Sequence, residues 1–458
     1  MDTSALCERL AHEIGGDVLA AADPGAAAES AAFNAAVVHR PAAVVAARDA
    51  ADVAAAVRIA GEAGRRVAVQ ATGHGAAATG EDTVLVSTRR LTGVVVDPVA
   101  RVARVAAGTR WREVIDAAVP HGLAPLSGSS SGVGAVGYTL GGGMGHLARR
   151  HGFAADHVRS VDLVRATGER ARVTAGSDPE LFWALRGGQG GFGIATAVEI
   201  DLFPVHAFHG GAMIVTGPAV ADVLYAFAAW APTLPEHVTT SVALLRMPPV
   251  DEVPPPLRGV VSLALRFGST GTAEEAEALL APIRRVAGAP VLDSIGTMSF
   301  AAVDGIHMDP PDPLPAVFRG GLLTGLPGDL VEGLLAVAGP DVEVPLAMVE
   351  LRLMGGALAR PAAVPNAVAG REGAFALSVV APAPPPLAEV APVVADGVVA
   401  ALAPWSTGTS LVNFAGHGVA AESIWRPDVL DRLRRAKAAA DPRNLFGGPL
   451  AELGAGAR

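Results

Sequence analysis

The first 205 residues alternate short apolar runs with polar turns, a pattern typical of small α/β units. Residues 51–66 place apolar side chains at helical spacing, and the apolar run that follows at 67–71 predicts a buried strand. A Thr at the start and a Gly at the end predict a helix over 109–122. Runs rich in β-branched residues predict further strands at 83–88, 93–98, 101–108 and 160–168.

From about residue 206 the pattern changes to longer strands with period-two alternation, at 239–248, 258–268 and 346–356. Helices such as 272–288 separate them, which indicates an antiparallel sheet backed by helices and hence an α+β second domain. The tail at 427–448 returns to an amphipathic helix that stops at an Asp-Pro pair.

Composition bounds the class of protein. A chain of 458 residues is too long for one core, so two domains are expected. There is no uninterrupted apolar run long enough to span a membrane, and the charged N-terminus is unlike a signal peptide. The single cysteine, Cys7, excludes an internal disulfide framework, and a net charge of -10 argues against nucleic acid or an anionic membrane as the main partner. These features favour a soluble cytoplasmic protein.

Three stretches combine glycine with other small residues, at 69–80, 127–145 and 186–196. Two G-x-G-x-x-G matches lie within them, at 132–137 and 188–193. The first runs into further glycines, which should prevent a helix from starting there, and the second follows a predicted helix rather than a strand, so a nicotinamide-binding fold is not expected. Because glycine is costly in regular structure, such loops favour close backbone approach to one long polyanionic ligand.

These loops carry a resemblance to a known family. The motifs "VQATGHG", "SSSGVGAVGYTLGGGMGHLARRHG", "LFWALRGGQGGFGIATAVEIDLFPV", "VELRLMGGALAR" and "NFAGHG…DPRNLF" occur in the order found in the berberine-bridge-enzyme-like FAD-linked oxidases. That family belongs to the vanillyl-alcohol-oxidase, or PCMH-type, flavoproteins. The resemblance implies a two-domain α+β PCMH-type fold. The resemblance also implies that residues 1–205 and 411–458 form the FAD-binding domain. Residues 206–410 would form the substrate domain, whose sheet covers the isoalloxazine ring.

The resemblance also implies how the cofactor is held. Family members join a loop histidine to the 8α-methyl of the flavin, and His74 occupies that position, although the arginine of the family loop is Gln70 here. The cysteine of a second attachment is replaced by Ser130, so a single link is expected, and Val133 stands where the family's oxidases let dioxygen reach the reduced flavin. The positions implied to contact FAD are Gln70, Ala71, Thr72, Gly73, His74, Gly75, Ala76, Ser129, Ser130, Val133, Gly134, Gly137, Tyr138, Gly142, Gly143, His146, Gly193, Ile194 and Asn413.

The base that removes the substrate proton is harder to assign. Leu411 and Phe414 replace the tyrosines of the family's Y-x-N-Y motif, whereas Asn413 is retained. Alternation along 346–356 places Glu350 and Arg352 on the face opposite the apolar one, either toward the flavin or as a solvated pair. We expect Glu350 to be the base. Burial beside a cavity would raise its pKa toward neutral, whereas a nearby arginine would lower it again, and Arg352 is expected to orient Glu350 or an anionic substrate.

Three further histidines are weaker candidates. His146 follows the glycine turn and could line the cofactor channel, His307 lies in a predicted loop that could cover the substrate, and His417 is expected at the surface. There is no grouping with metal-ligand spacing in the sequence. The resemblance favours an oxidase of a small natural product that uses dioxygen. A dehydrogenase or an oxygenating, rearranging enzyme of secondary metabolism stays open, as does a non-catalytic protein that binds flavin or another ligand.

Overall fold

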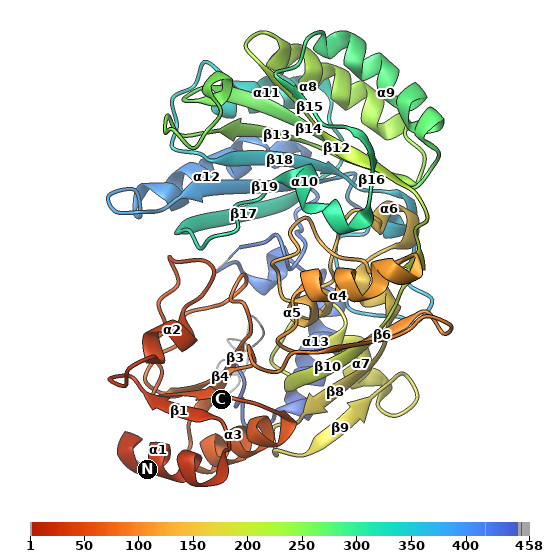
Figure 1. Cartoon of the computed structure of the whole chain (residues 1–458). Coiled ribbons are helices and arrows are strands. Elements are labelled where there is room, and N and C mark those ends of the chain that lie inside the picture. The colour runs from red at the N-terminus through yellow and green to blue at the C-terminus, as the bar shows by residue number, and fades with distance from the viewer. Residues whose placement is uncertain (1, 417, 448–449, 451–458) are drawn as a thin grey trace.

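The upper part of the molecule is built on one antiparallel sheet (Figure 1). The computed structural model describes residues 2–416, 418–447 and 450. The eight strands of this upper sheet run in the order β15-β12-β14-β13-β18-β19-β17, and β16 pairs with β12. The strands are β12 (Phe208–Thr216), β13 (Val238–Arg246), β14 (Val261–Ser269), β15 (Leu292–Asp293), β16 (Gly296–Met298), β17 (Ala316–Leu323), β18 (Met348–Leu353) and β19 (Phe375–Pro382).

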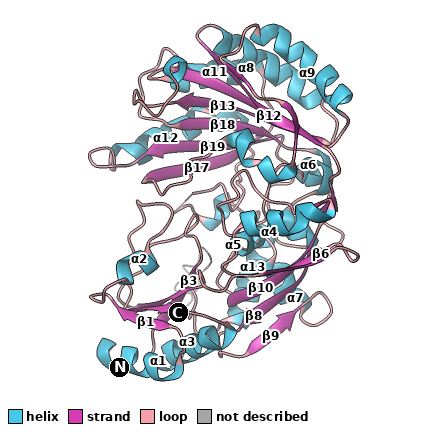
Figure 2. Cartoon of the chain, in the orientation of Figure 1, coloured by secondary structure: helices cyan, strands magenta, loops and turns pink. Residues whose placement is uncertain are grey.

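Period-two alternation divides this sheet into an apolar and a polar face. Leu265, Leu351 and Leu377 belong to a core cluster that packs under four helices. Those helices cover the upper face in Figures 1 and 2, and the opposite face looks toward the lower part of the molecule, with the short α10 (Asp304–His307) against it. The covering helices are α8 (Ala219–Trp230), α9 (Ala273–Ala287), α11 (Gly328–Ala338) and α12 (Val390–Ala401).

The lower part contains two smaller sheets (Figure 2). One has the order β1-β2-β4-β3, in which β2, β4 and β3 are parallel, and the other has the order β5-β6-β10-β8-β9 and is antiparallel. A two-stranded pair joins β7 to β11. Their strands are β1 (Asp17–Ala20), β2 (Ala43–Ala46), β3 (Arg66–Gln70), β4 (Thr83–Ser87), β5 (Val94–Asp97), β6 (Val102–Ala106), β7 (Leu123–Ala124), β8 (Val158–Val164), β9 (Arg170–Val173), β10 (Ile194–Asp201) and β11 (Phe203–Pro204).

The C-terminal helix returns to this lower part. Helix α13 lies beside α7, to which Arg432 and Glu180 tie it through two hydrogen bonds. The buried ammonium of Lys437 donates to the carbonyl of Gly191 at 2.6 Å, so the last helix also holds the third glycine loop. The helices of this part are α1 (Thr3–Glu13), α2 (Ala26–Ser30), α3 (Ala50–Glu62), α4 (Trp111–Ala118), α5 (Ala135–Leu140), α6 (Ala148–His151), α7 (Pro179–Leu185) and α13 (Pro427–Ala440).

Most predicted elements are present, but two local expectations are wrong. A six-residue helix, α5, does begin inside the glycine-rich stretch, with Gly134 as its N-cap. Burial of Ala135, Val136 and Leu140 in the core stabilises it despite the flanking glycines, since packing outweighs propensity in short helices. Helix α4 is capped by Arg110 rather than by a threonine.

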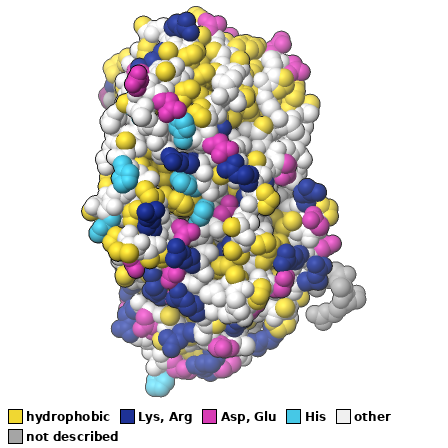
Figure 3. Space-filling model, turned by 90° about the vertical axis from the view of Figure 1, so that its right-hand side faces the viewer, with side chains coloured by type: hydrophobic (Ala, Val, Ile, Leu, Met, Phe, Trp, Pro, Cys, Tyr) yellow, Lys and Arg dark blue, Asp and Glu magenta, His cyan; other side chains and the backbone are white. Residues whose placement is uncertain are grey.

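The described residues contain no helix long and apolar enough to cross a membrane. On the face shown in Figure 3, basic and acidic side chains are interspersed over the lower half rather than gathered into one large patch of a single sign.

Candidate active site

His74 is held in the loop after β3 by a ring and a hydroxyl. Its imidazole stacks on Phe33, with ring centroids 3.8 Å apart and planes 13° from parallel. Its Nδ1 lies 2.9 Å from Oγ1 of Thr72, and that same oxygen accepts a hydrogen bond from the backbone N–H of Gly134 at 3.3 Å. Burial, helped by the charge of Arg110, lowers the pKa of His74 to about 4, so the imidazole is neutral at pH 7.

Small residues around His74 bring this loop close to its neighbours. Gly73 has a positive φ of 79°, and a Cβ there would lie 2.7 Å from the Cα of Ala32, so only glycine fits. Gly75 is exposed. A Cβ added there would have Nε2 of Gln189 as its nearest neighbour, at 3.9 Å. Ala76 is half-buried and donates weakly to the carbonyl of Gly73.

Gln70 is buried, and its side chain bonds to three other residues of the chain. Its buried amide donates to the carbonyls of Ser30 and Ala31, and its oxygen lies 2.9 Å from Nε2 of His39. The carbonyl of Ala71 accepts from Arg89. Both residues therefore fix the course of the chain ahead of His74.

The second loop supplies half-buried positions facing the same region. Ser129, Ser130 and Val133 are partly exposed, and Ser130 Oγ accepts from the N–H of Gly132 at 3.3 Å. Tyr138 is half-buried, but its hydroxyl is buried without a partner, and burial raises the pKa of that hydroxyl, so it is protonated.

A glycine turn receives the retained asparagine. Asn413 donates from Nδ2 to the carbonyl of Tyr138 at 2.9 Å, and a Cβ on Gly141 would lie 1.9 Å from its Oδ1. Gly142 lies against Val368, and Gly143 against the Tyr138 ring. This turn therefore joins the second loop to the C-terminal segment.

The third glycine loop, 186–196, is tied to the second by backbone hydrogen bonds. The N–H groups of Gly187 and Gln189 both donate to the carbonyl of Leu140 in the second loop. Gly193 packs its Cα against the carbonyl of Val164, and the side chain of Ile194 lies in the core. Ile194 can therefore offer only its backbone to a ligand.

The three loops together fit a long ligand such as FAD. They contact one another directly through Thr72, Gly134, Leu140 and Gln189. At Gly137 an added Cβ would meet no heavy atom within 4 Å, so the backbone there borders open space, and the same holds for Gly190. Glycine backbone that borders open space in this way allows a pyrophosphate or a flat ring to approach closely.

Across from the loops, the polar face of the sheet carries a buried charge cluster centred on Glu350. Oε1 of Glu350 accepts from Ser241 Oγ at 2.7 Å and from Arg266 Nη1 at 2.8 Å. Oε2 accepts from Arg352 Nη2 at 2.9 Å, and His307 Nε2 lies 3.4 Å from Oε1. Cross-strand register brings Ser241 beside both Arg266 and Arg352, so four side chains from β13, β14 and β18 and one from α10 meet.

Of the two opposing effects expected on the pKa of Glu350, that of the arginines prevails. Burial alone would raise the pKa, but the positive charges of Arg352 and Arg266 lower it well below its usual range. Glu350 is therefore ionised at neutral pH and stably paired with the arginines, not solvated on an open face.

Two histidines line a small cavity beside this cluster. His146 from the second loop and His307 from α10 have ring centroids 5.1 Å apart. Burial, then the field of Arg352, lowers the pKa of His146 to about 3, and burial with Arg266 lowers that of His307 well below its usual value, so both are neutral. His307 thus lies at a helix end inside the site rather than in a covering loop, while His417 lies outside the described residues.

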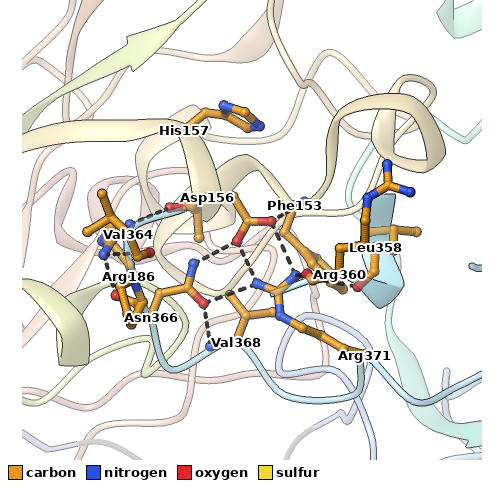
Figure 4. A network of polar contacts seen from close by, with 12 residues as sticks. Phe153, Asp156, His157, Arg186, Leu358, Arg360, Val364, Asn366, Val368 and Arg371 are labelled. Carbon is orange, nitrogen blue, oxygen red and sulfur yellow. Dashed lines mark hydrogen bonds and ion pairs between the residues drawn. The ribbon is translucent and has the colours of Figure 1, made fainter. Parts of the chain in front are cut away.

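A polar network fastens the segment after β18 to the lower part (Figure 4). Asp156 accepts from Asn366 and Arg371, each at 2.6 Å, and from the N–H of Phe153. Arg186 is fully buried and donates to four carbonyls, among them Pro365. This network holds Val368 against the glycine turn.

Sequence reasoning missed Arg266 and Ser241. Arg266 is a lone charge in an otherwise apolar strand, 261–268, and such a charge signals a buried partner. The partner depends on strand register, which the sequence does not give. Phe33 was missed as well, because its stacking on His74 joins segments 41 residues apart.

Comparisons with known proteins find FAD-binding relatives. A family model described as an FAD binding domain matches residues 41–174. The chain is 29% identical over 301 residues to (R)-6-hydroxynicotine oxidase of Paenarthrobacter nicotinovorans, which covers 65% of this chain and 64% of that enzyme. It is 37% identical over 175 residues to an FAD-dependent monooxygenase of Fusarium proliferatum, 38% of this chain and 34% of that protein. The chain thus spans less than two thirds of these curated relatives.

Solved structures resemble the fold over nearly the full length. The crystal structure of 6-hydroxy-D-nicotine oxidase from Arthrobacter nicotinovorans has a TM-score of 0.81 at 25% identity, and covers 94% of this chain and 96% of that one. Berberine bridge enzyme from Eschscholzia californica has a TM-score of 0.83 at 19% identity, and covers 97% and 98%.

Proposed function

We propose that the chain is a member of the berberine-bridge-enzyme-like, PCMH-type superfamily of FAD-linked oxidoreductases, and that it is an FAD-dependent oxidase of a small organic molecule. The proposed division assigns FAD to residues 1–205 and 411–458, and the substrate to residues 206–410. The proposed attachment is a single covalent bond from His74 to the 8α-methyl of the flavin.

The setting of His74 carries this proposal. A neutral imidazole is the state that can form a bond through a ring nitrogen, and the low pKa keeps it neutral. Phe33 and Thr72 fix the ring plane and one nitrogen, so the ring is orientated before any ligand arrives. Ser130 offers no thiol for a second bond.

Bound FAD would supply the redox chemistry of this reaction: a hydride acceptor for the substrate, and two electrons that, with two protons, would reduce dioxygen to hydrogen peroxide. The chain supplies orientation and charge. Asn413 and the turn at Gly141 hold one side of the loops together, and partly exposed Val133 leaves a small side chain where dioxygen would approach.

For the proton that leaves the substrate, we assign two residues different roles. Glu350 is ionised and can accept a proton, but two arginines stabilise its charge and make it a weak base. His146 is neutral, has an unpartnered Nε2 and lines the cavity, so it positions the substrate's hydroxyl or amine through a hydrogen bond. Its pKa of about 3 makes it a weak base as well, and Glu350 stays the proposed proton acceptor. Arg352 positions Glu350.

The test is to precipitate the purified protein with acid and to follow the yellow colour. With the wild type, flavin should stay in the pellet. With His74→Ala it should wash into the supernatant, while Phe33→Leu, which keeps the imidazole, should retain at least part of the link. Flavin that washes off the wild type would contradict covalent attachment, and protein without any flavin would contradict the whole proposal.

A second function is favoured by the relatives named FAD-dependent monooxygenases. Peroxide measured against substrate consumed separates the two, because an oxidase releases one peroxide per substrate and an oxygenating enzyme releases less. A non-catalytic flavin protein would keep its yellow colour under anaerobic conditions with every donor offered.

A further inference from the structure

The cavity beside the charge cluster has a wall that is richer in positive than in negative groups. It lies between the second glycine loop and the sheet, and its lining includes His146, Thr240, Ser241, Arg266, His307 and Arg352. Arg266 and Arg352 are 3% and 6% exposed, so the positive charges are buried from water.

The charges of this wall do not cancel. Glu350 is the one carboxylate bonded to the two guanidinium groups among the described residues. Asp304, the next acidic group, has its oxygens taken by the N–H and hydroxyl of Ser131, and lies 3.8 Å from the positive Arg112. With both histidines neutral, two arginines share one carboxylate, so the cluster keeps one net positive charge, and a buried net charge is costly.

Several donors around the cavity also lack a partner. Nε of Arg266, Nε of Arg352 and Nδ1 of His307 are all buried without a hydrogen bond. Arginine can only donate, so its contact of 3.1 Å makes Nε2 of His307 the acceptor, and the neutral ring then carries its hydrogen on Nδ1. Buried donors are normally satisfied, and three on one wall indicate a missing acceptor.

We propose that this cavity binds a carboxylate of the substrate, and that the natural substrate is therefore an organic acid or its anion. The inference rests on the proposed function, since it assumes that the group bound here belongs to the molecule that is oxidised. A planar carboxylate accepts from guanidinium and imidazole N–H groups and supplies the negative charge that the wall lacks.

The arginines are not explained by Glu350 alone. One guanidinium in a bidentate pair compensates one carboxylate, whereas here each oxygen of Glu350 is given to a different arginine. Arg352 also lies over the ring of Phe414, with its Cζ 5.5 Å from the ring centroid. This cation–π contact holds the guanidinium between the sheet and the C-terminal segment.

The experiment titrates the holoenzyme with acetate and benzoate, and with acetamide and benzamide as neutral probes of the same shape, by calorimetry and by changes in the flavin absorbance spectrum. At least one carboxylate should bind saturably, with its amide about 10- to 100-fold weaker. Arg352→Met and Arg266→Met should each weaken that carboxylate by a similar factor, and Arg352→Lys by less. Arg319→Met is the matched control, since Arg319 pairs with Asp396 under α12 and should leave the affinity unchanged.

Three results would overturn the inference. Amide and carboxylate could bind equally. The carboxylate could bind equally to the control and to both arginine variants. The Arg352 variant could lower the flavin redox potential while anion binding stays intact, which would assign the positive charge to the cofactor. Should either methionine variant fail to fold, the lysine variant and the comparison of amide with acid in the wild type still decide the matter. Failure here leaves bound flavin and its reduction by neutral donors untouched, whereas a protein without flavin would contradict the proposed function instead.

Discussion

Replacing Asp156 by Asn tests whether the network of Figure 4 holds the two parts of the molecule together. The side chains of Asp156 and Arg371 are 7% and 17% exposed, and their closest atoms are 2.6 Å apart. Asp156→Asn keeps the shape but removes the charge that compensates Arg371. Breaking a buried pair on one side costs about 3–5 kcal/mol, and the amide oxygen retained by asparagine reduces this, so we expect a loss of about 2–3 kcal/mol.

The measurement is a double-mutant cycle. Asp156→Asn, Arg371→Met and the double variant are unfolded in urea, with fluorescence and bound flavin followed separately because a chain of this size need not unfold in one step. The pair should show a coupling of at least about 1.5 kcal/mol. Arg319→Met with Asp396→Asn serves as a comparison, since that pair is more exposed and should couple by less than about 1 kcal/mol.

A coupling near zero for Asp156 and Arg371 would refute the reasoning. So would a loss of stability with no change in flavin retention, because the network is expected to keep Val368 beside the glycine turn. The lining of the cavity there includes Gly141, Val368 and Asn413.

Three other changes have defined outcomes. Gly141→Ala places a methyl group 1.9 Å from Asn413, so the hydrogen bond to the Tyr138 carbonyl should break and the FAD content measured by absorbance should fall; unchanged content would contradict it. Ser130→Cys should add a second flavin link, seen as a flavin that stays attached in the His74→Ala background, and no retained flavin would mean that position 130 does not face the ring. Lowering the pH should destabilise the protein, because the pKa of His146 is about 3 when folded and near 6.5 when unfolded, so the unfolded chain takes up the proton first as pH falls below 6.5. The share of His146 in the loss of unfolding free energy between pH 7 and pH 5 is about 2 kcal/mol, and urea unfolding of His146→Phe should show a loss smaller by that amount, since His74 and His307 keep their own shares.

Part of this site could be read from the sequence because local patterns determine it. Alternation along β18 sends Val349 and Leu351 into the core under the helices, and therefore sends Glu350 and Arg352 to the opposite face. The glycine loops were recognisable because few roles other than close backbone approach explain so many glycines.

The remainder depends on long-range packing. The pKa of Glu350 could not be judged from β18 alone, since Arg266 reaches it from β14 across β13, and the register of those strands is a tertiary property. His307 was expected in a covering loop, yet it is buried beside His146, which comes from a segment 161 residues earlier (307 against 146). Helix α5 forms because its apolar side chains are buried, a gain that propensity does not contain.

The hydroxyl of Thr72 has one more consequence. It contacts both Nδ1 of His74 and the N–H of Gly134, so the imidazole reaches its final orientation only after two loops 62 residues apart have come together. A chain with one of these loops still open would present a freely turning ring. Covalent loading would then act as a check on maturation, since only correctly closed chains would become coloured and misassembled ones would remain as colourless apoprotein.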